Sequence, residues 1–143
     1  MLYKEKPKDF NSKFEVVSCF VEYNNEILLL LRQDHKPQPN TLGVPAGKVD
    51  PGETIRKAMK REGNQETELN LRGASYIDVR YVRYNEYDFI YHMFKKTFQE
   101  KPPVTINPEE HKAYARVDRK KALELNLIKD LDECIRITYP ETR

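Results

Sequence analysis

The stretch from Gly47 to Leu69 reads GKVDPGETIRKAMKREGNQETEL and joins a turn-rich segment to one with helical periodicity. On a helix that turns 100° per residue, Glu62 and Glu66 lie within about 20° of Ile55. These carboxylates therefore point in the direction of the core, where an unpaired charge is costly. We expect a cation beside Glu62 and Glu66.

Two kinds of cation satisfy this requirement, a buried Arg or Lys side chain and a hard divalent metal ion. The periodicity leaves both open. Residues 33–52 contain four prolines and three glycines, which excludes a long regular element and is typical of a functional loop. Such a loop, leading into a helix N-terminus, brings backbone groups close to an anionic ligand. The combination favours a site for a metal ion and a phosphate.

The remaining pattern predicts a layered α/β domain. The segments 15–23 (EVVSCFVEY) and 26–32 (EILLLLR) flank Asn24-Asn25 and predict a β-hairpin. The run from Ile27 to Leu31 is apolar at every position, as expected for a strand covered on both faces.

The second half of the chain predicts a further hairpin and a closing helical region. Residues 76–98 form the hairpin around a short turn, and 113–117 form one more strand. Asp118 is the expected N-cap of the helical region. In that region, one packing stripe is expected from three residues with helical spacing: Ile128, Leu131 and Ile135.

Chain length, net charge and apolar runs limit the number of domains, the kinds of partner and the location that can be expected. With 143 residues the chain is expected to form one domain, 1–143, with residues 1–13 as a loose arm. A net charge of +2 argues against a nucleic-acid partner. The longest apolar run has five residues, too short for a membrane span, and the N-terminus does not resemble a signal peptide, so the cytoplasm is the expected location. Cys19 and Cys134 are expected as buried small side chains.

The segment quoted above resembles the signature of Nudix hydrolases. In that signature a Gly is followed by five residues and a Glu, then by seven residues and an Arg-Glu pair, with a further Glu four residues on. Gly47, Glu53, Arg61, Glu62 and Glu66 occupy these positions. The resemblance implies a Nudix-type α/β/α sandwich, with a mixed β-sheet between helices, over nearly the whole chain.

Three residues depart from the signature. Gly63 replaces an apolar residue and costs roughly 1 kcal/mol of helix stability relative to Ala. Gln65 replaces the first Glu of a Glu-Glu pair, which removes a charge and should weaken metal binding. Glu68 replaces the Gly that ends the helix, where a left-handed backbone would cost about 1–2 kcal/mol, unless Asn70 takes the cap role.

The resemblance also implies roles for individual residues. It implies Mg²⁺ (or Mn²⁺) held by Glu62, Glu66, Gln65 and the main-chain carbonyl of Ala46. Arg61 is expected to pair with Glu53 and hold the loop against the helix.

Further candidates lie outside the signature. Glu110, or Glu109, is the candidate base or additional metal ligand, although Glu62 remains an alternative base. Arg32 and Lys48 are candidates for phosphate contact. The tyrosines of the second hairpin are either strand core or rings that stack on a base.

The implied activity is hydrolysis by water of a phosphoanhydride bond in a nucleoside diphosphate derivative. The alternative is a Nudix-fold nucleotide-binding or regulatory module with weak catalysis, as the three departures suggest. The expected partner is a nucleotide-derived small molecule, with no membrane association, and the chain is expected to be a monomer or homodimer. The particular substrate stays open.

Overall fold

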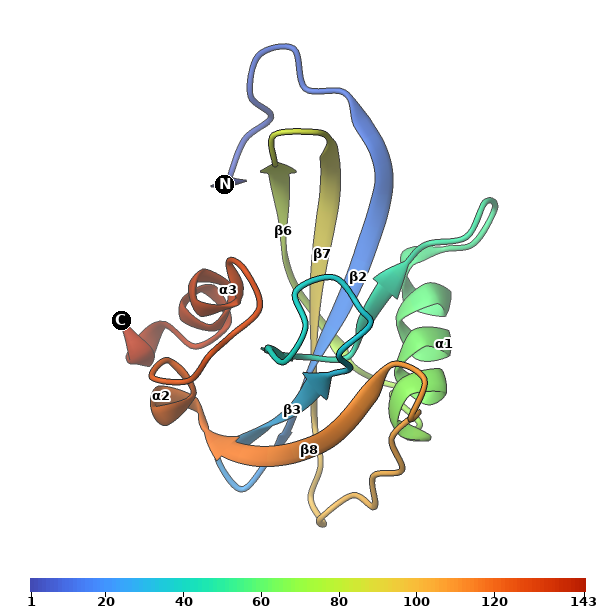
Figure 1. Cartoon of the computed structure of the whole chain (residues 1–143), viewed down its shortest axis with the longest axis vertical. Helices are drawn as coiled ribbons and strands as arrows, with labels where there is room; N and C mark the ends of the chain where they lie inside the picture. Colours follow the sequence, from blue (N-terminus) through green and yellow to red (C-terminus); the bar gives the residue numbers. More distant parts are fainter.

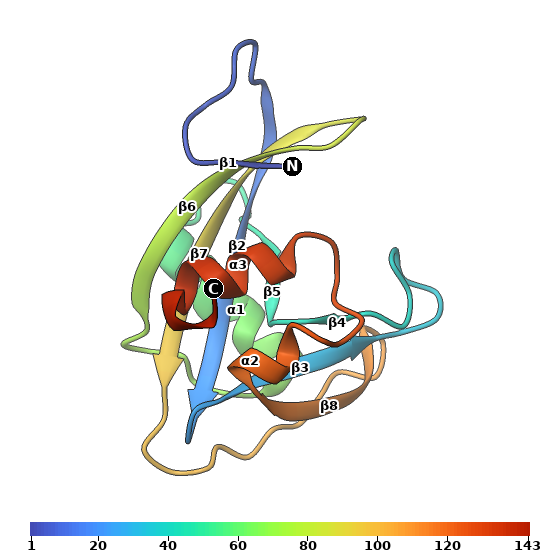
Figure 2. The same cartoon turned by 90° about the vertical axis from the view of Figure 1, so that its left-hand side faces the viewer.

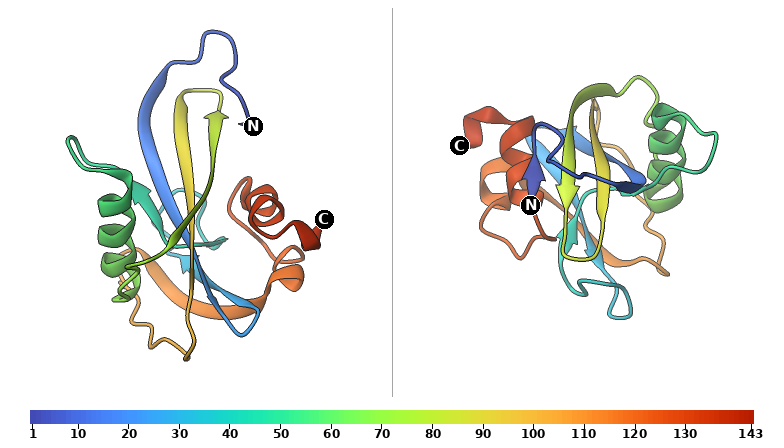
Figure 3. Two further views of the ribbon diagram at one scale, coloured as in Figure 1. Left: turned by 180° about the vertical axis from the view of Figure 1, so that it is seen from behind. Right: turned by 90° about the horizontal axis from the view of Figure 1, so that it is seen from above.

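The computed structural model describes all residues, 1–143, and has three layers. Helix α1 (Ile55–Thr67) covers one face of a β-sheet, and α2 (Arg119–Ala122) and α3 (Leu131–Thr138) cover the other face (Figures 1 and 3). A short 3-10 helix, Pro140–Thr142, follows α3. The expected α/β/α sandwich is confirmed.

The sheet has eight strands and mixed orientation. The path β1-β6-β7-β2-β3-β4 runs through neighbouring strands, while β5 pairs with β2 and β8 pairs with β3. The β2–β7 pair is parallel and the other pairs are antiparallel. The bounds are β1 (Leu2–Tyr3), β2 (Ser12–Tyr23), β3 (Glu26–Arg32), β4 (Leu42–Gly43), β5 (Ala46–Lys48), β6 (Ser75–Arg83), β7 (Asp88–Thr97) and β8 (His111–Asp118).

The predicted hairpin of β2 and β3 is confirmed. Asn24 and Asn25 have φ of 52° and 65°, the left-handed values that a tight two-residue turn requires. Alternate residues of β3 enter different cores, with Leu28 and Leu30 on the side of α1 and Ile27 and Leu29 on the side of α3. This is why the strand is apolar at every position.

The packing stripe predicted near the C-terminus, Ile128, Leu131 and Ile135, is buried as expected, although Ile128 is not helical. Leu131 and Ile135 are buried on α3, whereas Ile128 precedes the helix and contacts the same core. Asp118 caps α2, since its side chain accepts hydrogen bonds from the backbone N–H groups of Lys120 and Lys121. Cys19 and Cys134 are free and buried, as predicted.

Residues 1–13 are not a loose arm throughout. Leu2 and Tyr3 form β1, which pairs with Val82 and Tyr81 of β6 (Figure 2). The strand is too short for any periodic pattern to reveal it, so only the tertiary pairing defines it.

None of the helices has the length and apolar character that a membrane crossing requires.

Helix α1 begins and ends through local contacts. The Thr54 side chain accepts a hydrogen bond from the Lys57 N–H at 3.1 Å. At the other end Glu68 itself adopts the left-handed conformation, with φ 59° and ψ 21°, and its N–H donates to the Asn64 carbonyl. The expectation that Asn70 replaces it as the cap was wrong, because Asn70 instead accepts a hydrogen bond from the Arg72 N–H.

The glycine inside α1 makes room for a neighbour. A Cβ atom placed on Gly63 would overlap with Cδ1 of Leu71, a fully buried residue of the core under α1. The missing side chain at position 63 is therefore compensated by Leu71, which fills the same space. This contact explains why an apolar residue is not needed at position 63.

We predict that Gly63→Ala destabilises the protein by about 1–2 kcal/mol, because the overlap with Leu71 outweighs the gain in helix propensity. In a Leu71→Ala background the same change should become stabilising by up to about 1 kcal/mol. Chemical denaturation of the four proteins in this cycle measures both values. An equal cost of Gly63→Ala in both backgrounds would refute the contact.

The strained helix end gives a second prediction. Glu68→Gly should raise the free energy of unfolding by about 1 kcal/mol, since glycine adopts the left-handed conformation without steric cost. Asn70→Gly is the matched control and should not stabilise. Thermal unfolding of both variants checks this, and stabilisation by Asn70→Gly alone would contradict the assignment of the cap.

Candidate functional site

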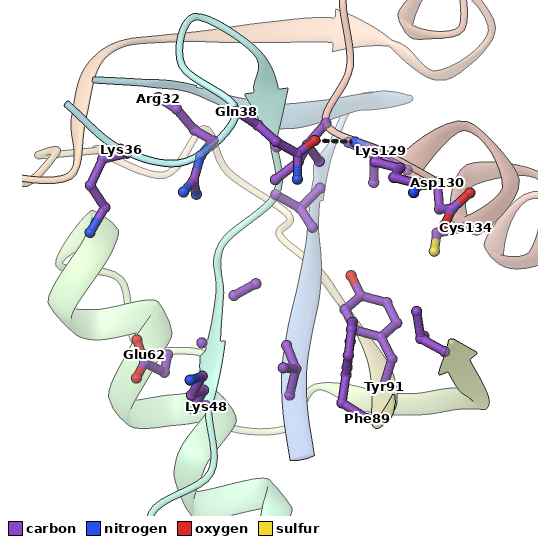
Figure 4. Close-up of a pocket in the computed structure, with 18 of the residues that line it drawn as sticks. Arg32, Lys36, Gln38, Lys48, Glu62, Phe89, Tyr91, Lys129, Asp130 and Cys134 are labelled. Carbon is purple, nitrogen blue, oxygen red and sulfur yellow. Dashed lines mark hydrogen bonds between the residues drawn. The ribbon is translucent and has the colours of Figure 1, made fainter. Parts of the chain in front are cut away.

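A cavity of about 620 Å³ opens between α1, the loop after β3 and the start of α3. Its two ends differ in chemistry. Glu62, Lys48, Arg32 and Lys36 lie at one end (Figure 4). The other end is formed by aromatic side chains and by the segment around Asp130. The sequence-predicted residues that line this cavity are Arg32, Ala46, Lys48, Glu62, Gln65, Glu66 and Glu110.

Glu66 is a buried carboxylate without an ion-pair partner. Its side chain is 8% exposed and receives only two long hydrogen bonds, both from the Ala46 N–H, at 3.3 and 3.4 Å. Burial raises the pKa of Glu66 to about 8, with a further rise from the charges of Glu62 and Glu110. The charge of Arg32 opposes this rise without cancelling it, and no cationic side chain contacts the Glu66 carboxylate.

Glu62 differs from Glu66 because an arginine holds it. Arg61 Nη1 lies 2.7 Å from Glu62 Oε1, so the ion-pair alternative applies to this carboxylate. The other oxygen of Glu62 faces Gly47, where a Cβ atom would overlap with the Glu62 carboxyl group. Gly47 thus allows the loop backbone to approach the helix closely.

Arg61 joins the loop to the helix, as expected. Its Nε and Nη2 donate to the two oxygens of Glu53 at 2.8 and 2.9 Å, and Nη2 also donates to the Lys48 carbonyl at 3.0 Å. These bonds hold the pKa of Glu53 at about 2. Neither Arg61 nor Glu53 lines the cavity, so both act through the residues that they position.

The cavity offers oxygen atoms that suit a hard cation, but only a few of them. Glu62, Glu66 and Gln65 line the cavity beside Ala46, and oxygen donors of this kind suit Mg²⁺. Gln65 is exposed, and its Oε1 accepts a 3.4 Å hydrogen bond from Arg61. The structure contains no group of three or more His, Cys, Asp or Glu side chains arranged to hold a metal. Gln65 occupies a position where the family signature has a glutamate.

Glu110 lies on the loop before β8 and is paired with Lys36. Lys36 Nζ lies 2.8 Å from Glu110 Oε2, and this bond lowers the pKa of Glu110. The two loops are also joined by a bond from the Gln33 N–H to the Glu110 carbonyl. Glu109 is exposed and does not line the cavity. Lys36 was missed in the sequence because its loop carries no periodic pattern.

His111 was also missed. It follows Glu110, is 4% exposed, and pairs with Arg32 across the β3–β8 ladder. Burial lowers the pKa of His111 to about 4, so the imidazole is neutral near pH 7, and its Nδ1 accepts or donates no hydrogen bond. A single histidine in a polar loop gave no indication of this burial.

Aromatic rings form the far wall of the cavity. Phe14 and Phe89 stack with their centroids 5.1 Å apart and their planes 9° apart. Tyr84, Tyr87 and Tyr91 also line the cavity, whereas Tyr76 and Tyr81 do not. The parallel pairing of β2 with β7 brings Phe14 and Phe89 to the same place in the sheet. Their contact could not be predicted from the sequence, because the register of this parallel pair was not known.

Comparisons with known proteins show the family and the fold. The family model described as NUDIX domain matches residues 13–137. A search of the curated proteins finds no match.

Several solved structures share the fold at low sequence identity. The MutT protein from Methanosarcina mazei Go1 has a TM-score of 0.81 and 20% identity, covering 96% of this chain and 99% of that chain. The Nudix domain of Shewanella oneidensis NrtR, solved with ADP-ribose, has a TM-score of 0.78 and 15% identity, covering 97% and 94%. The E. coli dihydroneopterin triphosphate pyrophosphohydrolase has a TM-score of 0.72 and 17% identity, covering 90% and 96%.

The family model covers most of the chain, and three of the five signature residues, Gly47, Glu62 and Glu66, line a single cavity. The chain belongs to the Nudix hydrolase family.

Proposed function

We propose that the protein is a metal-dependent pyrophosphohydrolase that cleaves a phosphoanhydride bond in a nucleoside diphosphate derivative. The observation that carries this proposal is Glu66, a buried carboxylate that faces the cavity without a cationic side chain in contact. A divalent cation is the counter-charge that suits this position. The cationic side chains nearby supply complementary charge for phosphate groups.

Glu66 and Glu62 would hold the metal ion, with Gln65 and the Ala46 carbonyl as weaker donors. Mg²⁺ is the proposed ion and Mn²⁺ a substitute, because both prefer oxygen ligands. When bound, the ion neutralises charge on the phosphate oxygens. Arg61 and Glu53 act as positioning residues, since their ion pair holds the loop that carries Ala46 and Lys48 against α1.

Arg32 and Lys48 are proposed to contact the phosphates. Both line the cavity, although Lys48 Nζ now lies 4.3 Å from the centroid of the Phe14 ring. Glu110 is the proposed general base, which accepts a proton from the attacking water. Lys36 lowers its pKa, so the carboxylate is ionised near neutral pH but is a weaker base than an unpaired glutamate. Glu62 is the alternative base. Pairing does not separate the two carboxylates, because Arg61 occupies one oxygen of Glu62 just as a lysine occupies one oxygen of Glu110.

The solved relatives support this substrate class. One is described with bound ADP-ribose, and another by name is a pyrophosphohydrolase of dihydroneopterin triphosphate. Both ligands carry a phosphoanhydride bond. The comparison covers 94% and 96% of these two chains, so the fold is shared over nearly their whole length.

A nucleotide-binding module with weak catalysis is the second candidate. Two observations favour it, the exposed Gln65 in place of a carboxylate and the Arg61 side chain on Glu62. Both reduce the negative charge available to a metal ion. The variants below separate the two candidates.

Glu66→Gln should lower kcat by on the order of 100-fold, because the buried charge that binds the ion is lost.

Gln65→Glu should lower the Mg²⁺ concentration needed for half-maximal activity by a few-fold. That gain is smaller than a buried charge would give, because position 65 is exposed. Phosphate release from a panel of NDP-sugars, dinucleotides and nucleoside triphosphates, with Mg²⁺ and Mn²⁺ titrated, measures both.

Asn64→Asp is the matched control for Gln65→Glu. It adds the same charge in the same turn of α1, but on an exposed side that does not line the cavity. The Mg²⁺ requirement should not change. Absence of hydrolysis by the wild type and by Gln65→Glu, across the whole panel, would favour the binding module instead.

Gly47→Ala should abolish most activity while the protein stays folded, because the new Cβ displaces the Glu62 carboxyl group. Gly43→Ala is the control, since its Cβ meets only Ile128 Cγ2 at an ordinary 3.5 Å. Circular dichroism and turnover of both variants check this. Equal activities would show that the position of Glu62 beside Gly47 is unimportant.

A further inference from the structure

Three polar side chains form a hydrogen-bonded row outside the cavity. Glu15 belongs to β2, His92 to β7 and Tyr76 to β6, and these three strands are neighbours in the sheet (Figure 1). Glu15 Oε2 lies 2.6 Å from His92 Nε2, and the Tyr76 hydroxyl oxygen lies 2.9 Å from His92 Nδ1. None of the three lines the cavity, so the proposed hydrolysis leaves them without a role.

The direction of each hydrogen bond in this row follows from the groups that form it. An ionised carboxylate only accepts hydrogen bonds, so the proton between Glu15 and His92 is carried by Nε2 of the imidazole. In the neutral imidazole, Nδ1 then has a lone pair and accepts the hydrogen bond of the Tyr76 hydroxyl. A carboxylate, an imidazole and a hydroxyl in this order form a chain in which the imidazole activates the hydroxyl as a nucleophile. Such a chain is recognised by its geometry and occurs on unrelated folds.

The base is shielded while the tyrosine is accessible. The His92 side chain is 12% exposed, whereas Tyr76 is 43% exposed. The Ser18 hydroxyl donates to the His92 carbonyl at 3.2 Å and holds the backbone of this residue. The Tyr76 ring packs edge-on against Phe94, with the centroids 5.2 Å apart and the planes at 81°, which holds the phenol beside the imidazole. A reagent from solvent can therefore reach a tyrosine that is already in contact with a base.

The Tyr76 hydroxyl needs that base in order to react. Burial, with a further rise from the charges of Asp78 and Glu15, raises the pKa of Tyr76, so the phenol keeps its proton near neutral pH. A nucleophile of this kind is generated during the attack itself, when a base within hydrogen-bond distance takes the proton. His92 Nδ1 lies at that distance.

We propose that Tyr76 is a nucleophile that accepts an acyl group from activated esters, with His92 as its base and Glu15 as a positioning residue. In this step the phenol oxygen bonds to the ester carbonyl carbon, and the bond from that carbon to the leaving oxygen breaks. The phenol proton passes to His92 Nδ1 and from there to the leaving oxygen. The products are an O-acyl tyrosine and the free alcohol. The site is separate from the cavity and does not depend on the proposed function.

Acetylation of the full chain by p-nitrophenyl acetate, without added metal, tests the proposal. The rate at each tyrosine is measured by digestion and peptide mass spectrometry. Tyr114 is the internal control, because it is 41% exposed, nearly the same as Tyr76, but is not hydrogen-bonded to a histidine. Tyr76 should be acetylated about 10-fold or more faster than Tyr114, since general-base catalysis is available only to Tyr76. Equal rates, or no acetylation of Tyr76, would overturn the proposal.

Two variants separate activation from exposure. His92→Gln removes the base and should lower the ratio of the Tyr76 rate to the Tyr114 rate about 10-fold or more. Glu15→Gln should lower this ratio by roughly a few-fold, because a neutral amide stabilises the charged imidazolium less well than a carboxylate. Glu86→Gln, which removes the same charge from the exposed β6–β7 turn, should leave it unchanged.

The ratio also distinguishes loss of activation from loss of the fold. Unfolding exposes both tyrosines, so it raises the rate at Tyr114 as well, and circular dichroism of each variant reports it directly. A ratio that His92→Gln leaves unchanged in a folded protein would overturn the proposal, as would an equal fall in Glu86→Gln and Glu15→Gln.

Discussion

The guanidinium group of Arg61 is the constraint on which the candidate site depends. It binds both oxygens of Glu53, one oxygen of Glu62 and the carbonyl of Lys48, so a single side chain fixes the loop, the helix and one cavity carboxylate. The loop can come this close only because Gly47 has no side chain. Charge-assisted bonds with planar geometry are well suited to hold a loop in one position.

The three cavity carboxylates, Glu62, Glu66 and Glu110, differ in the positive charge that is paired with them. Glu62 shares the single charge of Arg61 with Glu53. Glu110 is paired with Lys36, while Glu66 has only a backbone N–H for a partner. A low-dielectric cavity makes this imbalance expensive, which is why the pKa of Glu66 is raised. The carboxylate without an ion-pair partner is therefore Glu66, which lines the same cavity as Gly47 and Glu62.

The three departures from the family signature have different physical outcomes. At position 63 the lost side chain is replaced in space by Leu71, a residue eight positions away. At position 68 the strain is retained, since Glu68 is left-handed and exposed. At position 65 nothing compensates for the lost charge, although exposure to solvent reduces its effect. Only the last departure bears directly on the proposed metal site.

Local patterns were sufficient for the β2–β3 hairpin and for the cap at Asp118, because each depends on residues close in sequence. The pairing of Arg61 with Glu53 was expected from the family resemblance and is present in the structure. Local patterns could not predict which of Glu62 and Glu66 has an ion-pair partner and which does not. The pairing of β1 with β6, of Lys36 with Glu110, and of Glu15 with His92 joins segments that are distant in sequence. Periodicity reports which face of an element is buried, whereas the partner on that face is decided by how the elements pack.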